Sequence, residues 1–311
     1  MSARDVGASV RQRLLNQSRA QGRPFQELLQ YFAMERFLYR LSQSSFSDRF
    51  VLKGALLLIA WRAPLSRPTM DIDLAGRTSN ALDHIAELVS AMCEVATEPD
   101  GIEFNRDSIE VGRIKEGADY EGVRVRFQAT LAKARIPMQV DIGFGDVIVP
   151  GPTEVEYPTL LDFPAPVLQA YPKETVIAEK LEALTALGLL NSRMKDYYDI
   201  ALLSRLYPFE GEDLIGAIVA TFRHRRTTIE AEPIGLTDAF SADPAKMIQW
   251  RAFLRRSRFI EEAGDLERLV ANVRSFALPL LAAAAAAEPF TARWQPGGHW
   301  GVNGVHPGNG G

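Results

Sequence analysis

The residues best suited to chemistry are two aspartates one position apart, Asp71 and Asp73. On a β-strand, alternate side chains point to opposite faces, so both carboxylates project to one side while Ile72 faces the core. Two carboxylates this close repel each other unless a cation or a proton lies between them. A hard divalent ion such as Mg²⁺ binds one or two carboxylates together with nucleotide phosphates. The pair is therefore interpreted either as a metal site or as two solvated acids at the end of a strand.

A glycine suited to phosphate binding lies upstream of this pair. Gly54 stands 17 residues before Asp71 and follows Lys53, and the apolar run Ala55–Trp61 after it predicts a short turn into a buried helix. A glycine at a helix start lets backbone N–H groups approach a phosphate, although an ordinary loop glycine has the same local pattern. Combined with two acids on one face, this is the arrangement that nucleotidyl transfer requires. The turn would hold a triphosphate and the acids would hold the metals.

A third acid follows in a later strand pattern. Asp141 ends the predicted strand Met138–Ile142 and precedes Gly143. It could complete a two-metal site or activate an attacking hydroxyl, or it could simply form a turn before the glycine. Asp146, three residues after Gly143, is interpreted as a turn residue.

Three charged residues on later predicted helices are further candidates. Lys180 lies on a partly apolar stripe between Val176 and Leu184, where it would either extend to solvent or reach a buried anion such as a triphosphate. Asp196 and Asp199 are three positions apart on one helix face. Asp196 can complement the dipole at the helix start. Alternatively, both acids could orient Lys180 or the metal ligands without contacting the metal themselves.

The elements that must position these residues follow from hydrophobic spacing. Helices are expected around residues 10–15, 25–41, 55–61, 81–95, 173–187, 195–206, 212–222, 244–260 and 265–287. Strands are expected at 69–75, 102–104, 109–111, 123–127 and 138–142, followed by an extended proline-rich connection over 150–166. This order predicts an α+β fold: a small mixed sheet flanked by N-terminal and C-terminal helices.

The same pattern suggests four segments. They are an N-terminal helical segment (1–45), a catalytic core (46–165), a helical domain that completes the active site (166–287) and a disordered glycine-rich tail (288–311). The tail is assigned to disorder on its composition alone.

Composition excludes several classes of protein. With 311 residues, 47% hydrophobic and 24% charged, the chain is neither largely disordered nor collagen-like. The apolar runs Gly54–Trp61 and Phe276–Ala287 are shorter than the roughly 18–20 residues that span a bilayer, so no membrane helix is expected. A single cysteine, Cys93, and four histidines argue against a disulfide and a zinc site, and the start of the chain lacks a secretory pattern. We therefore expect a cytoplasmic protein.

Charge is unevenly distributed along the chain. Residues 1–70 carry 11 Lys and Arg against 4 Asp and Glu, whereas residues 71–170 carry 8 against 18. This is consistent with metal-binding carboxylates beside a phosphate-binding surface, or with chance segregation of solvated charges. The basic clusters Arg223–Arg226 and Arg251–Arg258 are interpreted as solvated helix faces or as contacts to RNA.

Five motifs carry a resemblance when they are taken together and in order. They are Phe50–Ala55, Arg67–Leu74, Val140–Asp146, Ala178–Leu184 and Arg193–Ile200. Over about residues 5–205 their order and spacing resemble the AbiEii/AbiGii-type nucleotidyltransferase toxin family, a branch of the polymerase-β-like superfamily. The segment Glu35–Leu41 also resembles one subgroup.

The resemblance implies roles for residues at matching motif positions. Asp71 and Asp73 would bind Mg²⁺, expected as two ions, and Asp141 is our inference for the third carboxylate. Lys180 would neutralise charge on the triphosphate, and Asp196 would complete the active site. The triphosphate would be cradled at Lys53, Gly54 and Ala55. Family members commonly have Gly, Ser or Thr at the position of Ala55, so a hydroxyl contact to phosphate is absent here.

The function implied by the resemblance is transfer of a nucleotide from an NTP to an acceptor hydroxyl. Members of the family are toxins of toxin–antitoxin or phage-defence pairs, and the MenT-like ones modify the 3′ end of tRNA. We therefore expect an NTP substrate, a tRNA acceptor, a cognate antitoxin and no membrane. Alternatives are nucleotidylation of a protein or small molecule, and a non-catalytic nucleotide-binding module.

Overall fold

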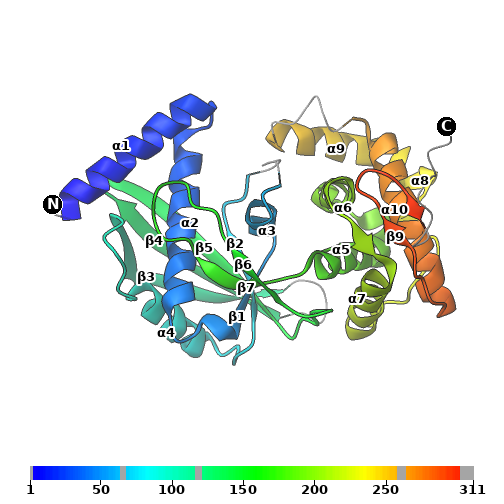
Figure 1. Ribbon diagram of the computed structural model, residues 1–311, viewed down its shortest axis with the longest axis horizontal. Coiled ribbons are helices and arrows are strands. Elements are labelled where there is room, and N and C mark those ends of the chain that lie inside the picture. The colour runs from blue at the N-terminus through cyan, green and yellow to red at the C-terminus, as the bar shows by residue number, and fades with distance from the viewer. Residues whose placement is uncertain (1–2, 64–67, 116–120, 258–263, 302–311) are drawn as a thin grey trace, which may run out of the picture. The chain divides into compact units, whose positions relative to one another are not determined.

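The described chain divides into two compact units (Figure 1). The computed structural model describes residues 3–63, 68–115, 121–257 and 264–301. The first unit comprises residues 1–146 with 152–171, and the second comprises 147–151 with 172–311. Arg67 of the second motif and residues 258–260 of a predicted helix lie outside the described residues.

The first unit is built on a seven-stranded mixed sheet in the order β3-β4-β5-β2-β1-β7-β6. Its strands are β1 (Phe50–Lys53), β2 (Ile72–Gly76), β3 (Ile102–Lys115), β4 (Glu121–Leu131), β5 (Ala134–Phe144), β6 (Thr153–Glu156) and β7 (Val167–Ala170). The pairs β2–β5 and β1–β7 are parallel, and the other neighbours are antiparallel. Helices precede and follow the sheet, which confirms the predicted α+β class.

The sheet differs from the sequence prediction in four strands, of which β6 and β7 had not been predicted at all. Residues 50–53, where no strand was predicted, form strand β1. Phe50, Val51 and Leu52 are all buried and so show no alternation. The two strands predicted at 102–104 and 109–111 are one strand, β3, with a register shift between Asn105 and Glu110. That shift interrupts the period of two and makes one strand resemble two.

Helices cover one face of this sheet and leave a polar face opposite. They are α1 (Ala3–Gln21), α2 (Phe25–Gln43) and α4 (Leu82–Cys93), of which α2 packs on β5 and α4 on β3 (Figure 1). The short helix α3 (Leu56–Ala60) contacts β1. Phe37 of α2 lies 5.4 Å from the ring of Phe127 on β4, centroid to centroid. Since side chains alternate along β4, Arg124 and Arg126 lie on the other face. The candidate carboxylates share that polar face.

The buried surface of α2 also carries polar side chains, each with a defined partner. Arg40 donates to both carboxylate oxygens of Asp100, at 2.7 and 3.1 Å. Gln30 donates to the backbone carbonyl of Pro137 at 2.9 Å. These bonds attach the strand ends and loops to α2, because buried polar groups are costly unless they are paired.

The second unit is mainly helical. Its helices are α5 (Lys173–Leu187), α6 (Met194–Leu206), α7 (Gly211–His224), α8 (Asp238–Ser241), α9 (Pro244–Ser257) and α10 (Leu266–Ala286). A small sheet joins β8 (Phe209–Glu210), β9 (Arg293–Trp294) and β10 (Trp300–Gly301). The five helices predicted in this region are confirmed to within a few residues, over the part that the structure describes.

The prediction of a disordered tail is wrong for residues 293–301, which form β9 and β10. Trp294 is buried, its indole N–H donates to the carbonyl of Ser204 at 2.6 Å, and its ring lies 4.9 Å from that of Phe276. Aromatic burial therefore anchors a segment whose glycine content alone resembles a linker. Residues 302–311 of the predicted tail lie outside the described residues.

Helix α10 is long and apolar enough, by length and composition alone, to cross a membrane. The sequence prediction considered only its second half and found it too short. The core helix of a soluble protein meets the same criterion, and α10 packs on α6 and α7 with Val273, Phe276 and Leu280 fully buried. Core packing within the second unit accounts for its apolar residues.

A buried ion pair on α2 holds the segment that leads to β7. Glu35 and Arg36 are buried and paired at 3.0 Å. The Glu35 carboxylate accepts a hydrogen bond from the backbone N–H of Leu160 at 2.7 Å, and Arg36 donates to the carbonyl of Pro164 at 2.7 Å. Burial raises the pKa of Glu35 to about 7, although Arg36 and the Leu160 N–H act in the opposite direction.

We expect Glu35 to make the protein less stable as pH rises from about 4.5 to about 7. In that interval the unfolded chain releases the Glu35 proton while the folded protein retains it, which costs roughly 3 kcal/mol in total. Urea unfolding of the wild type and of Glu35→Gln, followed across this pH range, measures the effect. In Glu35→Gln the free energy of unfolding should no longer fall across this pH range by the amount due to Glu35. In Glu87→Gln, on an exposed glutamate of α4, it should fall as in the wild type. The same pH dependence of the unfolding free energy in all three proteins would refute the assignment.

Candidate active site

Three aspartates converge on the polar face of the sheet. Asp71 directly precedes β2, and Asp73 within β2 pairs in parallel register with Asp141 on β5. One carboxylate oxygen from each of the three lies within 4.8 Å of the others. The structure thus brings together the two acids of the Asp71–Asp73 motif and the separately inferred third acid.

Neighbouring side chains orient the carboxylates. The Thr69 hydroxyl donates to Asp71 Oδ1 at 2.5 Å. Arg124, directly opposite Asp141 on β4, donates to both of its oxygens at 2.8 and 2.6 Å. Gln139 donates to Asp141 Oδ2 at 3.3 Å. These hydrogen bonds hold the carboxylates of Asp71 and Asp141 in place despite their mutual repulsion.

The donor set fits a hard divalent cation. Carboxylate oxygens are the ligands that Mg²⁺ prefers, and three acids from two adjacent strands supply them without histidine or cysteine. Each carboxylate oxygen has two lone pairs, so the Arg124 bond leaves Asp141 able to coordinate. Asp141 is only 8% exposed, while Asp71 and Asp73 are half-buried. An ion would therefore reach the site from solvent on the side of Asp71 and Asp73.

Gly54 is required by its contact with Asp73. It follows β1, which pairs with β2 so that Lys53 lies opposite Asp73. Its φ is +75°, and a Cβ built there would overlap the Asp73 carboxylate. The sequence prediction assigned this glycine to phosphate binding. The structure gives it a prior role, because only a residue without a side chain leaves space for the Asp73 carboxylate.

Lys53 forms an ion pair with a buried acid, Asp146. Its ammonium lies 2.8 Å from Asp146 Oδ2, which also accepts a hydrogen bond from the Tyr171 hydroxyl at 2.7 Å. Asp146 was interpreted as a turn residue, and it does follow a bend at Gly145, but the sequence did not reveal that its side chain is buried and paired. Its carboxylate is 1% exposed and links β1 to the end of β7. Contact of Lys53 and Ala55 with a triphosphate stays a prediction.

Lys180 and Asp196 form a second cluster, which belongs to the second unit. The Lys180 ammonium lies 2.9 Å from Asp196 Oδ1 and 2.8 Å from Asp199 Oδ2. Arg193 donates to the other oxygen of Asp196 at 2.6 Å. Burial by itself raises the pKa of Asp196, but Lys180 and Arg193 outweigh it and hold that pKa below its usual value. Lys180 is 15% exposed and ion-paired rather than extended into solvent.

The predicted site residues thus fall into two groups. Asp71, Asp73 and Asp141 meet in the first unit with Gly54, and Lys180 meets Asp196 and Asp199 in the second. That both groups act on one substrate stays a prediction. Within the basic cluster 223–226, Arg225 pairs with Glu179 and Glu182 at 3.2 and 2.8 Å, so this arginine is part of the helix packing.

Sequence reasoning missed the residues that hold the acids. Arg124 could have been found, because in the predicted strand Val123–Phe127 it faces away from the valines, on the polar side. Its pairing with Asp141 depends on strand register, which has no local signal. Arg193 stands three residues before Asp196, a spacing compatible with contact on a helix.

Replacing Gly54 by alanine should destabilise the protein more than replacing Gly22. Both glycines have positive φ, but a Cβ at Gly22 meets no atom within 4 Å, whereas at Gly54 it meets the Asp73 carboxylate. Strain from φ is common to both, so we expect an additional loss of roughly 1–3 kcal/mol for Gly54→Ala. Urea unfolding of the two variants measures this difference. Equal losses would show that Asp73 moves aside at no cost.

Lys180→Met should destabilise the second unit by roughly 3–5 kcal/mol, because it leaves two buried carboxylates without the cation between them. The loss should be larger at pH 8 than at pH 5, since a carboxylate deprived of its cation is costly only when ionised. Chemical denaturation at both pH values measures it. Lys133→Met, on an exposed lysine, is the control. A loss no greater than that of the control would contradict the buried ion-pair assignment.

Two solved structures from Helicobacter pylori are similar to this chain, and each is 16% identical and covers 84% of it. One is described as a candidate nucleotidyltransferase (TM-score 0.47, 96% of that chain covered), and the other is JHP933 (TM-score 0.48, 93% covered). No curated protein matches at a significant level.

A family model described as the nucleotidyl transferase AbiEii toxin of type IV toxin–antitoxin systems matches residues 36–273. This match covers most of the chain and confirms the resemblance read from the five motifs. It also continues past residue 205, where the motifs end, through α7, α8 and α9 into α10. The chain therefore belongs to the AbiEii family of nucleotidyltransferase toxins.

Proposed function

We propose that this nucleotidyltransferase toxin transfers a nucleoside monophosphate from an NTP to the 3′ end of tRNA, with Mg²⁺ as cofactor. The observation that carries the proposal is the meeting of Asp71, Asp73 and Asp141 within 4.8 Å on a polar sheet face beside Gly54. Membership of a nucleotidyltransferase toxin family supports the reaction class and implies both an NTP substrate and a cognate antitoxin.

In the proposed reaction the 3′ hydroxyl oxygen of the acceptor attacks the α-phosphorus of the NTP. A phosphodiester bond forms, the bond to the bridging oxygen of pyrophosphate breaks, and the hydroxyl proton is released. Asp71, Asp73 and Asp141 would hold magnesium, in our proposal two ions. Magnesium supplies positive charge that stabilises the attacking and leaving oxygens.

The chain's own residues would orient the reactants. Arg124 and Gln139 hold Asp141 in one orientation, and Thr69 holds Asp71. We assign the triphosphate to the turn at Gly54 and Ala55, with Lys53 nearby, where backbone N–H groups can contact phosphate oxygens. Lys180 would neutralise charge on the same triphosphate. Asp196 and Asp199 would then hold its ammonium in position, as their contacts in the second unit suggest.

We propose tRNA as the acceptor and the cytoplasm as the location. Both NTP and tRNA are present in the cytoplasm, which is where we place the protein. A protein or small-molecule acceptor would use the same three carboxylates, so the acceptor has to be identified by experiment.

The test is incubation of the purified protein with Mg²⁺, each α-labelled NTP in turn and total bacterial tRNA, followed by a denaturing gel. We expect label on tRNA with one or two of the nucleotides. Asp71→Asn should reduce transfer by at least roughly 100-fold, because it removes a charged ligand while keeping the side-chain shape. Asp83→Asn, on an exposed acid of α4, is the control and should transfer at the wild-type rate.

The alternatives give distinct results in the same assay. Label on protein instead of tRNA would identify a polypeptide acceptor. Transfer by Asp71→Asn at the wild-type rate would overturn the metal assignment. Metal-dependent NTP binding without any transfer, to tRNA or to protein, would indicate a binding module.

A further inference from the structure

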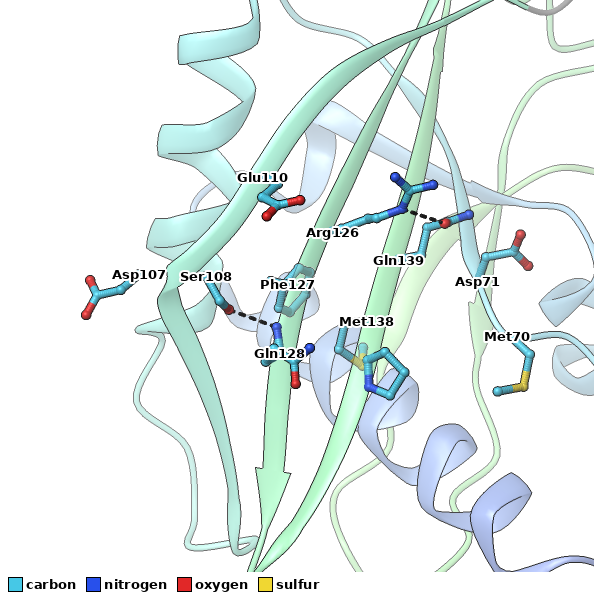
Figure 2. A pocket seen from close by; sticks show the side chains of 11 residues that line it. Met70, Asp71, Asp107, Ser108, Glu110, Arg126, Phe127, Gln128, Met138 and Gln139 are labelled. Atoms are coloured by element: carbon cyan, nitrogen blue, oxygen red, sulfur yellow. Dashed lines mark hydrogen bonds between the residues drawn. The ribbon is translucent and has the colours of Figure 1, made fainter.

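A pocket of about 510 Å³ opens on the polar face of β3, β4 and β5, next to the aspartate cluster (Figure 2). Its volume lies within the range of about 300–1,000 Å³ typical of small-molecule sites. Asp71 lies on its rim, so the pocket shares one residue with the proposed metal site. A group bound in the pocket would therefore extend directly to the carboxylates.

The pocket offers hydrogen-bonding groups and little positive charge. Figure 2 shows Glu110, Arg126, Gln128 and Gln139 along the three strands, while Asp107 points away from the others. Arg126, directly opposite Glu110 in the β3–β4 pair, is the one cation among the residues that line the pocket. With Asp71 and Glu110 against one arginine, a phosphate group would be repelled. The pocket suits an uncharged group that both donates and accepts hydrogen bonds.

Hydrogen bonds connect the pocket to the aspartate cluster. Arg126 Nε donates to the Gln139 side-chain oxygen at 3.3 Å, and Gln139 in turn donates to Asp141 Oδ2 at 3.3 Å. Gln139 therefore belongs both to the lining of the pocket and to the contacts that orient Asp141, a proposed metal ligand. This continuity connects the pocket to the proposed metal site.

We propose that this pocket binds the 3′-terminal nucleoside of the acceptor RNA, with a preference for a base that carries an exocyclic amino group. The inference rests on the proposed function, because it concerns the acceptor of that reaction. A nucleoside presents a flat, uncharged base with hydrogen-bond donors and acceptors, together with ribose hydroxyls. Single-stranded RNA ends are commonly recognised by stacking on arginine and by bonds to base edges.

Each recognition element has a candidate among the lining residues. The exposed Arg126 guanidinium offers a planar surface for the base, and Met70, 50% exposed, offers an apolar contact beside Asp71. The Glu110 carboxylate can accept from an amino group but not from a carbonyl, which is the basis of the preference. The Gln128 amide can both donate and accept.

The test measures binding of two short single-stranded RNAs without NTP, by fluorescence anisotropy. The RNAs share one sequence and end in adenosine or in purine riboside, which lacks the 6-amino group. We expect the wild type to bind the adenosine end roughly fivefold more tightly, the effect of about one hydrogen bond. Glu110→Ala should abolish this ratio. Glu103→Ala, at an exposed glutamate of the same strand but outside the pocket, should retain it.

Equal affinity of the wild type for both RNAs, or an unchanged ratio in Glu110→Ala, would overturn the proposal. The transfer assay with tRNA is read separately. Selective binding without nucleotide transfer would support the pocket and contradict the proposed function. Transfer without end-selective binding would support the function and contradict the pocket.

Discussion

The close approach of Asp73 to Gly54 is the constraint on which the site depends. Strand β2 lies between β1 and β5, so its central carboxylate meets the turn after β1 on one side and Asp141 on the other. The β2–β5 pairing holds Asp141 opposite Asp73, and a side chain at position 54 would occupy the space of the acid. Backbone geometry therefore sets the spacing of the proposed metal ligands, and the contacts of Arg124, Gln139 and Thr69 orient their carboxylates.

Both charged clusters follow one electrostatic design. In the first unit Arg124 holds Asp141 through two hydrogen bonds, and in the second Lys180 lies between Asp196 and Asp199. Burying a carboxylate is costly, and a well-placed cation offsets the cost only when the geometry is good. The result is a set of acids held in fixed orientation by neighbouring cations.

One face of the main sheet is packed against helices, and the other carries the candidate functional residues. Helix α2 covers one face and attaches loops through Gln30, Glu35, Arg36 and Arg40, all of them buried and bonded. The other face is polar along β4 and β5 and carries both the aspartate cluster and the pocket beside it. The packing that holds the sheet therefore lies on the face opposite the proposed site.

The sequence by itself determined the α+β class, most helices, the same-face acids Asp71 and Asp73, and the motifs that reveal the family. These features depend on local periodicity and spacing. Tertiary structure decided the rest: strand β1, the single strand β3, the ordered segment around Trp294, and the partners of Asp141 and Asp146. Arg124 is 17 residues from Asp141, and Lys53 is 93 residues from Asp146. Contacts between strands depend on register and burial, which are properties of the folded chain and leave no local pattern in the sequence.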